Sequence, residues 1–201
     1  MSQIKLVVFD ANGVCINGGF PETSQALGKK FKRDWKEIYA VLYTKYFNMA
    51  AVKKISQQSA WADAIKELNL PITVKEIKKI HYGLMSVNKA TINLVNSLKK
   101  KYQVALLSKN TRSHFNDLNK LFPKMSSAFG KNMINTWEYN LPKASPETMK
   151  FILKRFKASP AEAVYIDDQE QNLQAAKDLG VHTILFKNFS QANKKLKTIL
   201  K

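Results

Sequence analysis

The sequence has little that is typical of a secreted or membrane protein. Its 201 residues include one cysteine, Cys15, which excludes an internal disulfide. No apolar run approaches the roughly 20 residues that a helix needs to cross a bilayer. The N-terminus also lacks the charged, apolar and small-residue layout of a signal peptide. We therefore expect a cytoplasmic protein in a reducing compartment, with no membrane partner.

Acidic residues and arginines are also scarce. Aspartate and glutamate number 15 against 33 lysines and arginines, so the formal net charge is +18. Such a charge attracts polyanions, including nucleic acid. However, the arginines are only Arg33, Arg112 and Arg155, and arginine is the side chain best suited to base edges and bidentate phosphate contacts. Because the lysines are spread along the chain, a nucleic-acid partner is conceivable, but we favour a solvated basic surface.

Apolar runs alternate with amphipathic segments in most of the chain. Buried strands are predicted at 6–9, 102–107, 163–166 and 181–186, and helices at 88–101, 111–122, 145–157, 170–180 and 190–200. Pro123 should stop the second of these helices, and the stretch after it, including 128–129 and 133–134, is less regular. This alternation predicts an α/β fold, with a mostly parallel sheet and helices on both of its faces.

Residues from about 20 to 86 differ from the rest, because they carry helical patterns and no strand signal. Apolar side chains recur at helical spacing through 26–33, 34–50 and 57–68, and Thr73 with Glu76 forms a capping box. Before them, the run at 17–19 (Asn-Gly-Gly) is typical of a hairpin turn. We expect an all-helical cap over residues 17–86, inserted into a three-layer Rossmann-like core made of residues 1–16 and 87–201.

Polar residues follow three of the predicted strands. Asp10 ends the first strand, Ser108 follows the second, and Asp167 and Asp168 end the third, while Lys143 lies in a loop between them. Parallel strands end at one edge of a sheet, where α/β proteins place their ligand sites. Clustered carboxylates there repel one another unless a cation lies between them, and hard oxygen ligands suit Mg²⁺. Together with a lysine and a serine, such a cation can orient a phosphate.

Four motifs contain these polar residues. In chain order they are Phe9–Val14, Leu106–Ser108, Lys143–Glu147 and Tyr165–Asn172, the last followed by Leu179-Gly180. This series resembles the haloacid dehalogenase-like (HAD) hydrolase superfamily, in the branch with a small helical cap after the first strand. Its pattern is most similar to sugar-phosphate phosphatases and to the phosphatase domain of soluble epoxide hydrolases. The fourth motif is the most specific, and the resemblance covers nearly the whole chain.

The resemblance implies a phosphatase that acts on a small phosphorylated substrate. Asp10 would be the nucleophile that forms an aspartyl-phosphate, and Ser108 would bind the phosphoryl oxygens. Lys143 would offset the negative charge of Asp10 and of the phosphoryl group, because in this chemistry an anionic nucleophile attacks an anionic group. Lys109 and Asn110, directly after Ser108, are further candidate phosphate ligands.

The resemblance also implies a Mg²⁺ cofactor. Asp10, the backbone carbonyl of Asn12 and Asp168 would bind the ion, with Asp167 binding it directly or through water. Acidic residues in the first and the fourth motif are typical of the phosphatases. Haloacid dehalogenases lack the metal, so they do not need an acidic pair such as Asp167-Asp168 in the fourth motif.

Two positions depart from the phosphatase pattern. Asn12 stands where the family has the aspartate that protonates the leaving oxygen and later activates water; asparagine can do neither, and such help is worth roughly 10²–10⁴ in rate. Lys109 stands where asparagine often follows the serine, which adds positive charge near the phosphate. Three functions therefore remain open: a phosphatase slowed by Asn12, a phosphate-binding or regulatory relative with weakened catalysis, and a metal-independent dehalogenase-type hydrolase, which needs no acid at Asn12.

The histidines are weaker candidates. We expect His81 at the surface or boundary of a cap helix and His182 in a structural place at the start of a strand. His114, two residues after Arg112 on the helix that follows Ser108, is a candidate to line the site.

Overall fold

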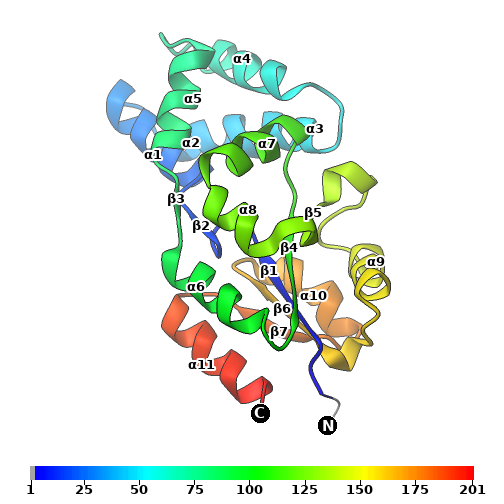
Figure 1. Ribbon diagram of the computed structural model, residues 1–201. Helices are drawn as coiled ribbons and strands as arrows, with labels where there is room; N and C mark the ends of the chain where they lie inside the picture. Colours follow the sequence, from blue (N-terminus) through cyan, green and yellow to red (C-terminus); the bar gives the residue numbers. More distant parts are fainter. Residues whose placement is uncertain (1–2) are drawn as a thin grey trace.

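A five-stranded parallel sheet forms the core of the computed structural model, which describes residues 3–201 (Figure 1). Its spatial order is β5-β4-β1-β6-β7. Every residue of β1 and β6 is buried, as expected for strands covered on both faces. The strands are β1 (Leu6–Asp10), β4 (Gln103–Ser108), β5 (Met133–Asn135), β6 (Ala163–Asp167) and β7 (His182–Leu185).

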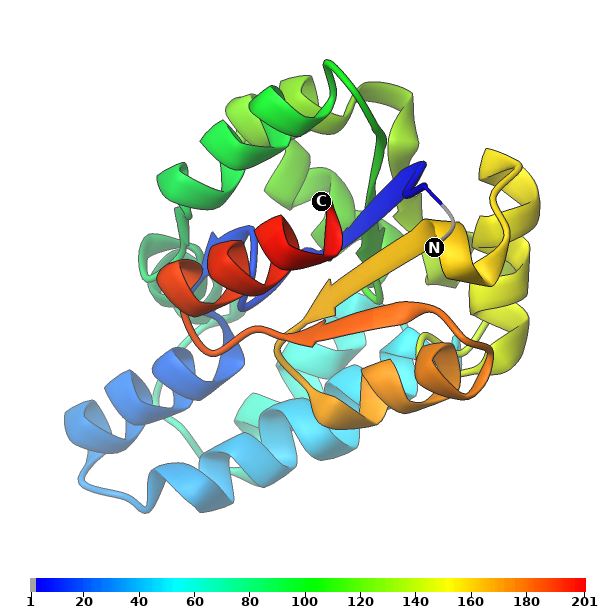
Figure 2. The same cartoon turned by 90° about the horizontal axis from the view of Figure 1, so that it is seen from below.

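Two layers of helices cover the sheet, and alternate residues of β1 contact each of them. Val7 and Phe9 face α6 (Lys89–Leu98), α8 (Pro123–Phe129) and α11 (Phe189–Ile199). Leu6 and Val8 face α9 (Pro146–Phe156) and α10 (Glu170–Asp178). Figure 2 shows α11 and α10 on opposite sides of the sheet. The three-layer Rossmann-like fold predicted from the sequence is confirmed.

A third group of helices, which we call the cap, lies beyond the carboxyl ends of the strands (Figure 1). Its own core is aromatic: Trp61 is fully buried, and Phe20 stacks on it with ring centroids 5.8 Å apart. The cap comprises α1 (Phe20–Phe31), α2 (Trp35–Tyr39), the π-helix η1 (Ala40–Phe47), α3 (Asn48–Ala51), α4 (Gln57–Glu67) and α5 (Val74–Gly83).

The chain enters and leaves the cap through two short strands that pair with each other. In this antiparallel pair, β2 (Ile16–Asn17) lies beside β3 (Ser86–Val87). The hairpin predicted at 17–19 is therefore wrong, because the partner of β2 comes about 70 residues later in the chain. Gly18, with φ of 78°, and Gly19 instead turn the chain into α1. The expectation of no strand within 20–86 is wrong at Ser86.

Two further core elements were missed. Helix α7 (Arg112–Leu121) ends before Pro123 as predicted, but Pro123 itself begins α8 at the first helical position, where proline's missing N–H is not needed. The stretch predicted as irregular contains β5, which has only three residues and is too short for a periodic signal. The remaining turns are the 3₁₀-helices η2 (Gly130–Asn132), η3 (Thr136–Tyr139) and η4 (Pro160–Glu162).

Helix α7 joins the core to the cap. Gln57 of the cap accepts hydrogen bonds from Thr111 and, at 2.6 Å, from the Ser113 hydroxyl. Tyr82 of the cap donates to Asp117 Oδ2 at 2.7 Å, and its hydroxyl lies 3.3 Å from His114 Nδ1. The core and the cap are therefore in direct contact on this side of the molecule.

The prediction for His81 is wrong at this junction, and the candidate role of His114 in the site is not supported. His81 is completely buried, and its Nδ1 forms a 2.8 Å hydrogen bond with Thr23 Oγ1. Its ring packs 5.3 Å from that of His114, which is 1% exposed and does not line the cavity described below. Burial lowers the pKa of His81, and it lowers the pKa of His114 to about 4, so both rings are neutral at pH 7. Only His182 lies, as predicted, at the start of a strand.

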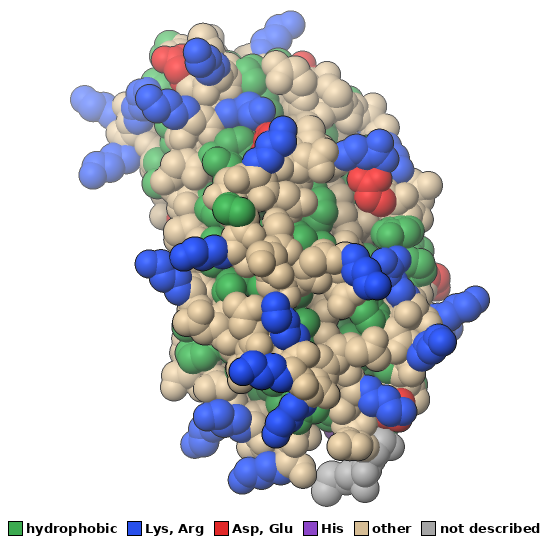
Figure 3. Space-filling view, in the orientation of Figure 1, with side chains coloured by type: hydrophobic (Ala, Val, Ile, Leu, Met, Phe, Trp, Pro, Cys, Tyr) green, Lys and Arg blue, Asp and Glu red, His purple; other side chains and the backbone are tan. Residues whose placement is uncertain are grey.

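On the face in Figure 3, lysines and arginines are scattered over both the core and the cap. Within residues 3–201, no helix is long and apolar enough to cross a membrane.

Candidate active site

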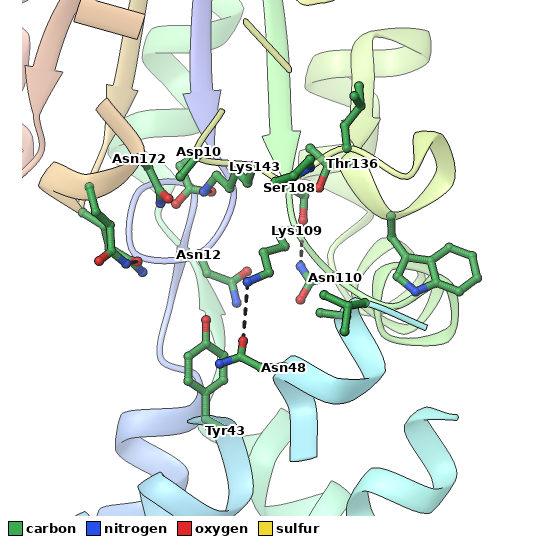
Figure 4. Close-up of a pocket in the computed structure, with 18 of the residues that line it drawn as sticks. Asp10, Asn12, Tyr43, Asn48, Ser108, Lys109, Asn110, Thr136, Lys143 and Asn172 are labelled. Carbon is green, nitrogen blue, oxygen red and sulfur yellow. Dashed lines mark hydrogen bonds and ion pairs between the residues drawn. The ribbon is translucent and has the colours of Figure 1, made fainter. Parts of the chain in front are cut away.

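The predicted catalytic residues meet at the carboxyl edge of the sheet, below the cap (Figure 4). Asp10 is the last residue of β1, Ser108 the last of β4 and Asp167 the last of β6. Both β4 and β6 pair with β1 in parallel register, so their ends lie side by side. The topology therefore brings together residues that are up to about 160 positions apart in the sequence.

Lys143 connects two of these carboxylates. Its Nζ lies 2.6 Å from Asp10 Oδ1 and 2.9 Å from Asp167 Oδ2, and all three side chains are at least nine-tenths buried. Ser145 caps α9 directly after this loop, and Thr148 donates from its hydroxyl to the Pro142 carbonyl at 2.6 Å. These contacts fix the loop that delivers the lysine.

The Asp167 carboxylate is held from both sides. Tyr165 donates to its Oδ2 at 2.5 Å, while the backbone N–H of Gln169 and the side-chain amide of Asn172 donate to Oδ1 at 2.9 and 3.0 Å. Three donors in addition to Lys143 orient this group and satisfy both of its oxygens. Tyr165 is therefore a supporting residue that the motif comparison did not single out.

Asp10, Asp167 and Asp168 form a cluster that can hold a cation. One oxygen of each lies within 4.8 Å of the others. Gly13 shapes this place: its φ is 83°, and a Cβ there would lie 2.2 Å from Asp168 Oδ2. Because hard oxygen ligands at this spacing suit Mg²⁺, the residues fit the predicted ion.

The electrostatics of Asp10 support the same interpretation. Burial raises its pKa to about 8; Asp167 and Asp168 add to the rise, and Lys143 opposes it. The pKa of Lys143 is itself raised, because Asp10 and Asp167 together outweigh the effect of its burial. A cation between the carboxylates would offset their repulsion and favour ionised Asp10.

Ser108 is set by an amide network. Asn110 donates from Nδ2 to Ser108 Oγ at 2.7 Å. Asn135, at the end of β5, in turn accepts from the Asn110 N–H at 3.0 Å and donates to its carbonyl at 2.9 Å. The loop after β4 is thus fixed by the neighbouring strand, so that Ser108 and Asn110 lie together as predicted.

A cavity of about 840 Å³ lies between the core and the cap. Its floor includes Asp10, Asn12, Ser108 and Lys143, and its roof comes from the cap, including Tyr43 and Asn48 (Figure 4). The volume is typical of a site for a small molecule. Two residues that line it, Asn12 and Thr136, each have a buried oxygen (Oδ1 and Oγ1) without a hydrogen-bond partner within the described residues.

Comparison with protein families agrees with this geometry. The family model of haloacid dehalogenase-like hydrolases matches residues 4–180, which is most of the chain. This chain belongs to the haloacid dehalogenase-like hydrolase family. The resemblance in the four motifs is confirmed, and the protein is accordingly a hydrolase of the HAD type.

Curated relatives of this HAD protein include a phosphatase and a larger, bifunctional enzyme. It is 24% identical to the D-ribitol-5-phosphate phosphatase of Bacteroides thetaiotaomicron, over 98% of this chain and 99% of the relative. It is 26% identical over 130 residues to bifunctional epoxide hydrolase 2 of Rattus norvegicus. That match covers 63% of this chain and 24% of the rat enzyme, so the chain spans about a quarter of the length of this relative.

Solved structures share the fold. A HAD family enzyme of Bacteroides thetaiotaomicron, in complex with magnesium and inorganic phosphate, superposes with a TM-score of 0.71 at 23% identity, over 90% of this chain and 93% of that one. The L-2-haloacid dehalogenase of Xanthobacter autotrophicus superposes with a TM-score of 0.65 at 16% identity, over 90% of this chain and 76% of that one. Structures with this fold thus include both a protein that binds magnesium and phosphate and a haloacid dehalogenase.

The cavity-lining residues outside the motifs could not be predicted from the sequence. Tyr43, Asn48 and Lys53 line the cavity from above, and Trp137 and Asn140 line it from the η3 region of the core. None of them belongs to a motif, and a cap residue carries no pattern that distinguishes a cavity-lining side chain from a surface one. Trp137 also donates from Nε1 to the Ala50 carbonyl at 3.2 Å, a further contact between core and cap.

Proposed function

We propose that this protein is a Mg²⁺-dependent phosphohydrolase that transfers the phosphoryl group of a small phosphorylated metabolite to Asp10. The observation that carries the proposal is the pairing of Lys143 with both Asp10 and Asp167, beside the third carboxylate of Asp168. A lysine in this place favours the ionised form of Asp10 and offsets the repulsion between the nucleophile and the phosphate.

The other floor residues have defined tasks in this reaction. The Ser108 hydroxyl and the Asn110 amide donate hydrogen bonds to the phosphoryl oxygens, and Lys143 neutralises the charge that develops on them. The sequence also makes Lys109 a candidate ligand of this group, but its ammonium contacts the cap, with Nζ 3.4 Å from Asn48 Oδ1, and we assign it no role in the transfer. Because the cap covers this edge of the sheet, water is excluded while the aspartyl-phosphate forms on Asp10.

The ion would be held by Asp10, Asp168 and the backbone carbonyl of Asn12, with Asp167 binding it directly or through water. When bound, Mg²⁺ supplies positive charge that polarises and orients the phosphoryl group. The cap that closes the site would comprise residues 17–86, and the core residues 1–16 and 87–201; the paired β2 and β3 strands mark where the chain crosses between them.

Asn12 limits this phosphatase. Its amide has no proton to give to a leaving oxygen, and it cannot activate water against the aspartyl-phosphate. We therefore propose slow turnover, most evident with alkyl phosphates, whose leaving groups need a proton.

The same residue favours a second candidate function, namely a phosphate-binding or regulatory protein that uses the cavity without turnover. Metal-independent dehalogenase chemistry is less favoured, because Asp167 and Asp168 are both retained beside Asp10. The feature of the four motifs that resembles a dehalogenase is the missing acid at Asn12.

Hydrolysis of 4-nitrophenyl phosphate distinguishes these functions, because its leaving group needs little protonation. We expect Mg²⁺-dependent hydrolysis by the natural protein and none by Asp10→Asn, with Asp178→Asn on the exposed side of α10 as the matched control. Activity that survives in Asp10→Asn would contradict the assigned nucleophile. A folded protein that binds phosphate but shows no hydrolysis would instead support the binding function.

A further inference from the structure

The cavity carries more positive charge than the transfer of one phosphoryl group uses. Three lysines line it, namely Lys53, Lys109 and Lys143, whereas Asp10 is the only acidic residue among the described residues that line it. Lys143 is already paired with Asp10 and Asp167. Within residues 3–201, neither Lys53 nor Lys109 takes part in an ion pair.

Lys109 points away from the nucleophile and toward the cap. In Figure 4 its side chain extends from the end of β4 toward Asn48 of the cap. Nζ lies 3.4 Å from Asn48 Oδ1, a neutral oxygen at the start of α3. The ammonium therefore lies between the floor and the roof of the cavity, and its hydrogen bond leaves its charge unbalanced.

This position is unfavourable for a free ammonium. Desolvation by the surrounding residues and the nearby charge of Lys143 both lower the pKa of Lys109. The Lys109 side chain is still exposed to the cavity, so a ligand can reach it. An anion bound there would offset both effects, as an ion pair stabilises a charged group in a partly desolvated place.

The rest of the cavity wall suits the same kind of ligand. Lys53 donates from Nζ to Asn140 Oδ1 at 2.6 Å and lies 4.2 Å from the centre of the Trp137 ring, so a second ammonium faces the cavity from the cap side. The cavity is also lined by amide side chains that can bind hydroxyl or carboxylate oxygens, namely Asn48, Asn110, Asn140, Gln169 and Gln171.

We propose that Lys109 and Asn48 form a subsite for a second anionic group of the substrate, a carboxylate or a further phosphate, remote from the phosphoryl group that is transferred. The proposal rests on the proposed phosphatase function and narrows its substrate class to phosphomonoesters that carry another anion. Lys109 is then a specificity residue, and Ser108, Asn110 and Lys143 remain for the transferred group.

Isothermal titration calorimetry in the presence of Mg²⁺ tests this with matched pairs of compounds. 3-Phosphoglycerate is compared with glycerol 3-phosphate, phosphoglycolate with 2-hydroxyethyl phosphate, and fructose 1,6-bisphosphate with fructose 6-phosphate. The pairs cover two lengths of carboxylate and one further phosphate, so they distinguish the two sources of the second anion. In the natural protein, we expect the doubly anionic member of at least one pair to bind about tenfold more tightly.

The variant Lys109→Gln should abolish that preference and change the binding of the singly anionic member less than about twofold. Lys54→Gln is the matched control, because Lys54 is an exposed cap lysine beside Lys53 that does not line the cavity, and it should keep the preference. Equal weakening of both members by Lys109→Gln would overturn the proposal and assign Lys109 to the transferred phosphoryl group. Absence of any preference in the natural protein would overturn it too.

These readouts are independent of turnover. If the phosphatase function fails, 4-nitrophenyl phosphate is not hydrolysed, but a preference that depends on Lys109 would still support the subsite. If only the subsite fails, hydrolysis continues, and the paired compounds bind alike.

Discussion

Lys143 Nζ lies 2.6 Å from Asp10 Oδ1, and this buried pair joins the loop before α9 to the end of the central strand. The same ammonium contacts Asp167 at 2.9 Å, so one lysine balances two carboxylates that have almost no access to solvent. Such an arrangement is costly to disturb, because removal of one partner leaves buried charge without compensation.

Replacement of this lysine should therefore affect both stability and chemistry. We expect Lys143→Met to lower the free energy of unfolding by about 3–5 kcal/mol, and to lower kcat for 4-nitrophenyl phosphate by about 10²–10³-fold. Denaturant unfolding and initial rates at saturating Mg²⁺ measure the two effects. Lys131→Met, at an exposed position, should change neither. A variant at Lys143 that keeps natural activity would show that the pair has no catalytic role.

Restoration of an acid at Asn12 should speed the reaction. We expect Asn12→Asp to raise kcat for an alkyl phosphate such as glycerol 3-phosphate by roughly 10²–10⁴-fold. The gain with 4-nitrophenyl phosphate should be smaller, because that leaving group needs little protonation. Asn12→Ala separates the effect of the acid from the loss of the amide, whose oxygen has no hydrogen-bond partner in the described residues, and it should give no gain. If Asn12→Asp were no faster with either compound, the predicted role of this position would be wrong.

Gly13 should control the affinity for Mg²⁺. A Cβ at this residue would lie 2.2 Å from Asp168 Oδ2, so Gly13→Ala must displace that carboxylate. Since displaced groups around a metal typically cost 10–100-fold in affinity, we expect the half-saturating Mg²⁺ concentration to rise by about tenfold or more. Titration of activity with Mg²⁺ measures this. Gly83→Ala, where a Cβ meets open space, is the control and should leave the half-saturating concentration unchanged.

The histidines at the junction of core and cap should make stability depend on pH. Burial lowers the pKa of His114 from 6.5 to about 4; Lys78 lowers it further, while Asp117 opposes the shift. The His114 ring is also packed against the rings of neighbouring residues, namely Tyr82, Phe20, Phe47 and His81.

This shift determines how stability changes with pH. Between the pKa of 6.5 in the unfolded chain and that of about 4 in the folded one, the unfolded chain binds more protons than the folded one. The contribution of His114 is therefore fully present above pH 6.5 and is lost as the pH falls to about 4.

We expect this loss to amount to about 3 kcal/mol for His114, with His81 adding to it in the same direction. Denaturant unfolding at several values of pH between 6.5 and 4 measures the slope. His114→Gln should reduce the slope, whereas His182→Gln, at an exposed residue, should not. An unchanged slope in His114→Gln would mean that this ring does not titrate with unfolding.

Much of the core and its site could be predicted because local patterns determine them. The runs that became β1 and β6 are apolar throughout, since both faces of a central parallel strand are buried. The capping box at Thr73 and Glu76 forms as expected, because it depends only on residues three positions apart. The strand-end rule placed Asp10, Ser108 and Asp167 at one edge without knowledge of the strand order.

Elements that depend on distant partners were harder to predict. The two-residue strand β2 has no periodicity of its own, and only the return of the chain at β3 makes it a strand. His81 has the same pattern as a boundary residue on its helix, yet α7 from the core and Phe20 from α1 enclose it. Burial of this kind is a property of the assembled layers.

The sequence by itself determined the fold class, the family motifs and the types of side chain at the site, because strand burial, caps and motif spacing act over short stretches of chain. Only the tertiary structure decided which cap residues face those motifs. It placed Asn48 beside Lys109 and the Trp137 indole against the carbonyl of Ala50. The physical reason is that these contacts join elements separated by about 60 to 90 residues, so their geometry follows from how the cap packs on the core.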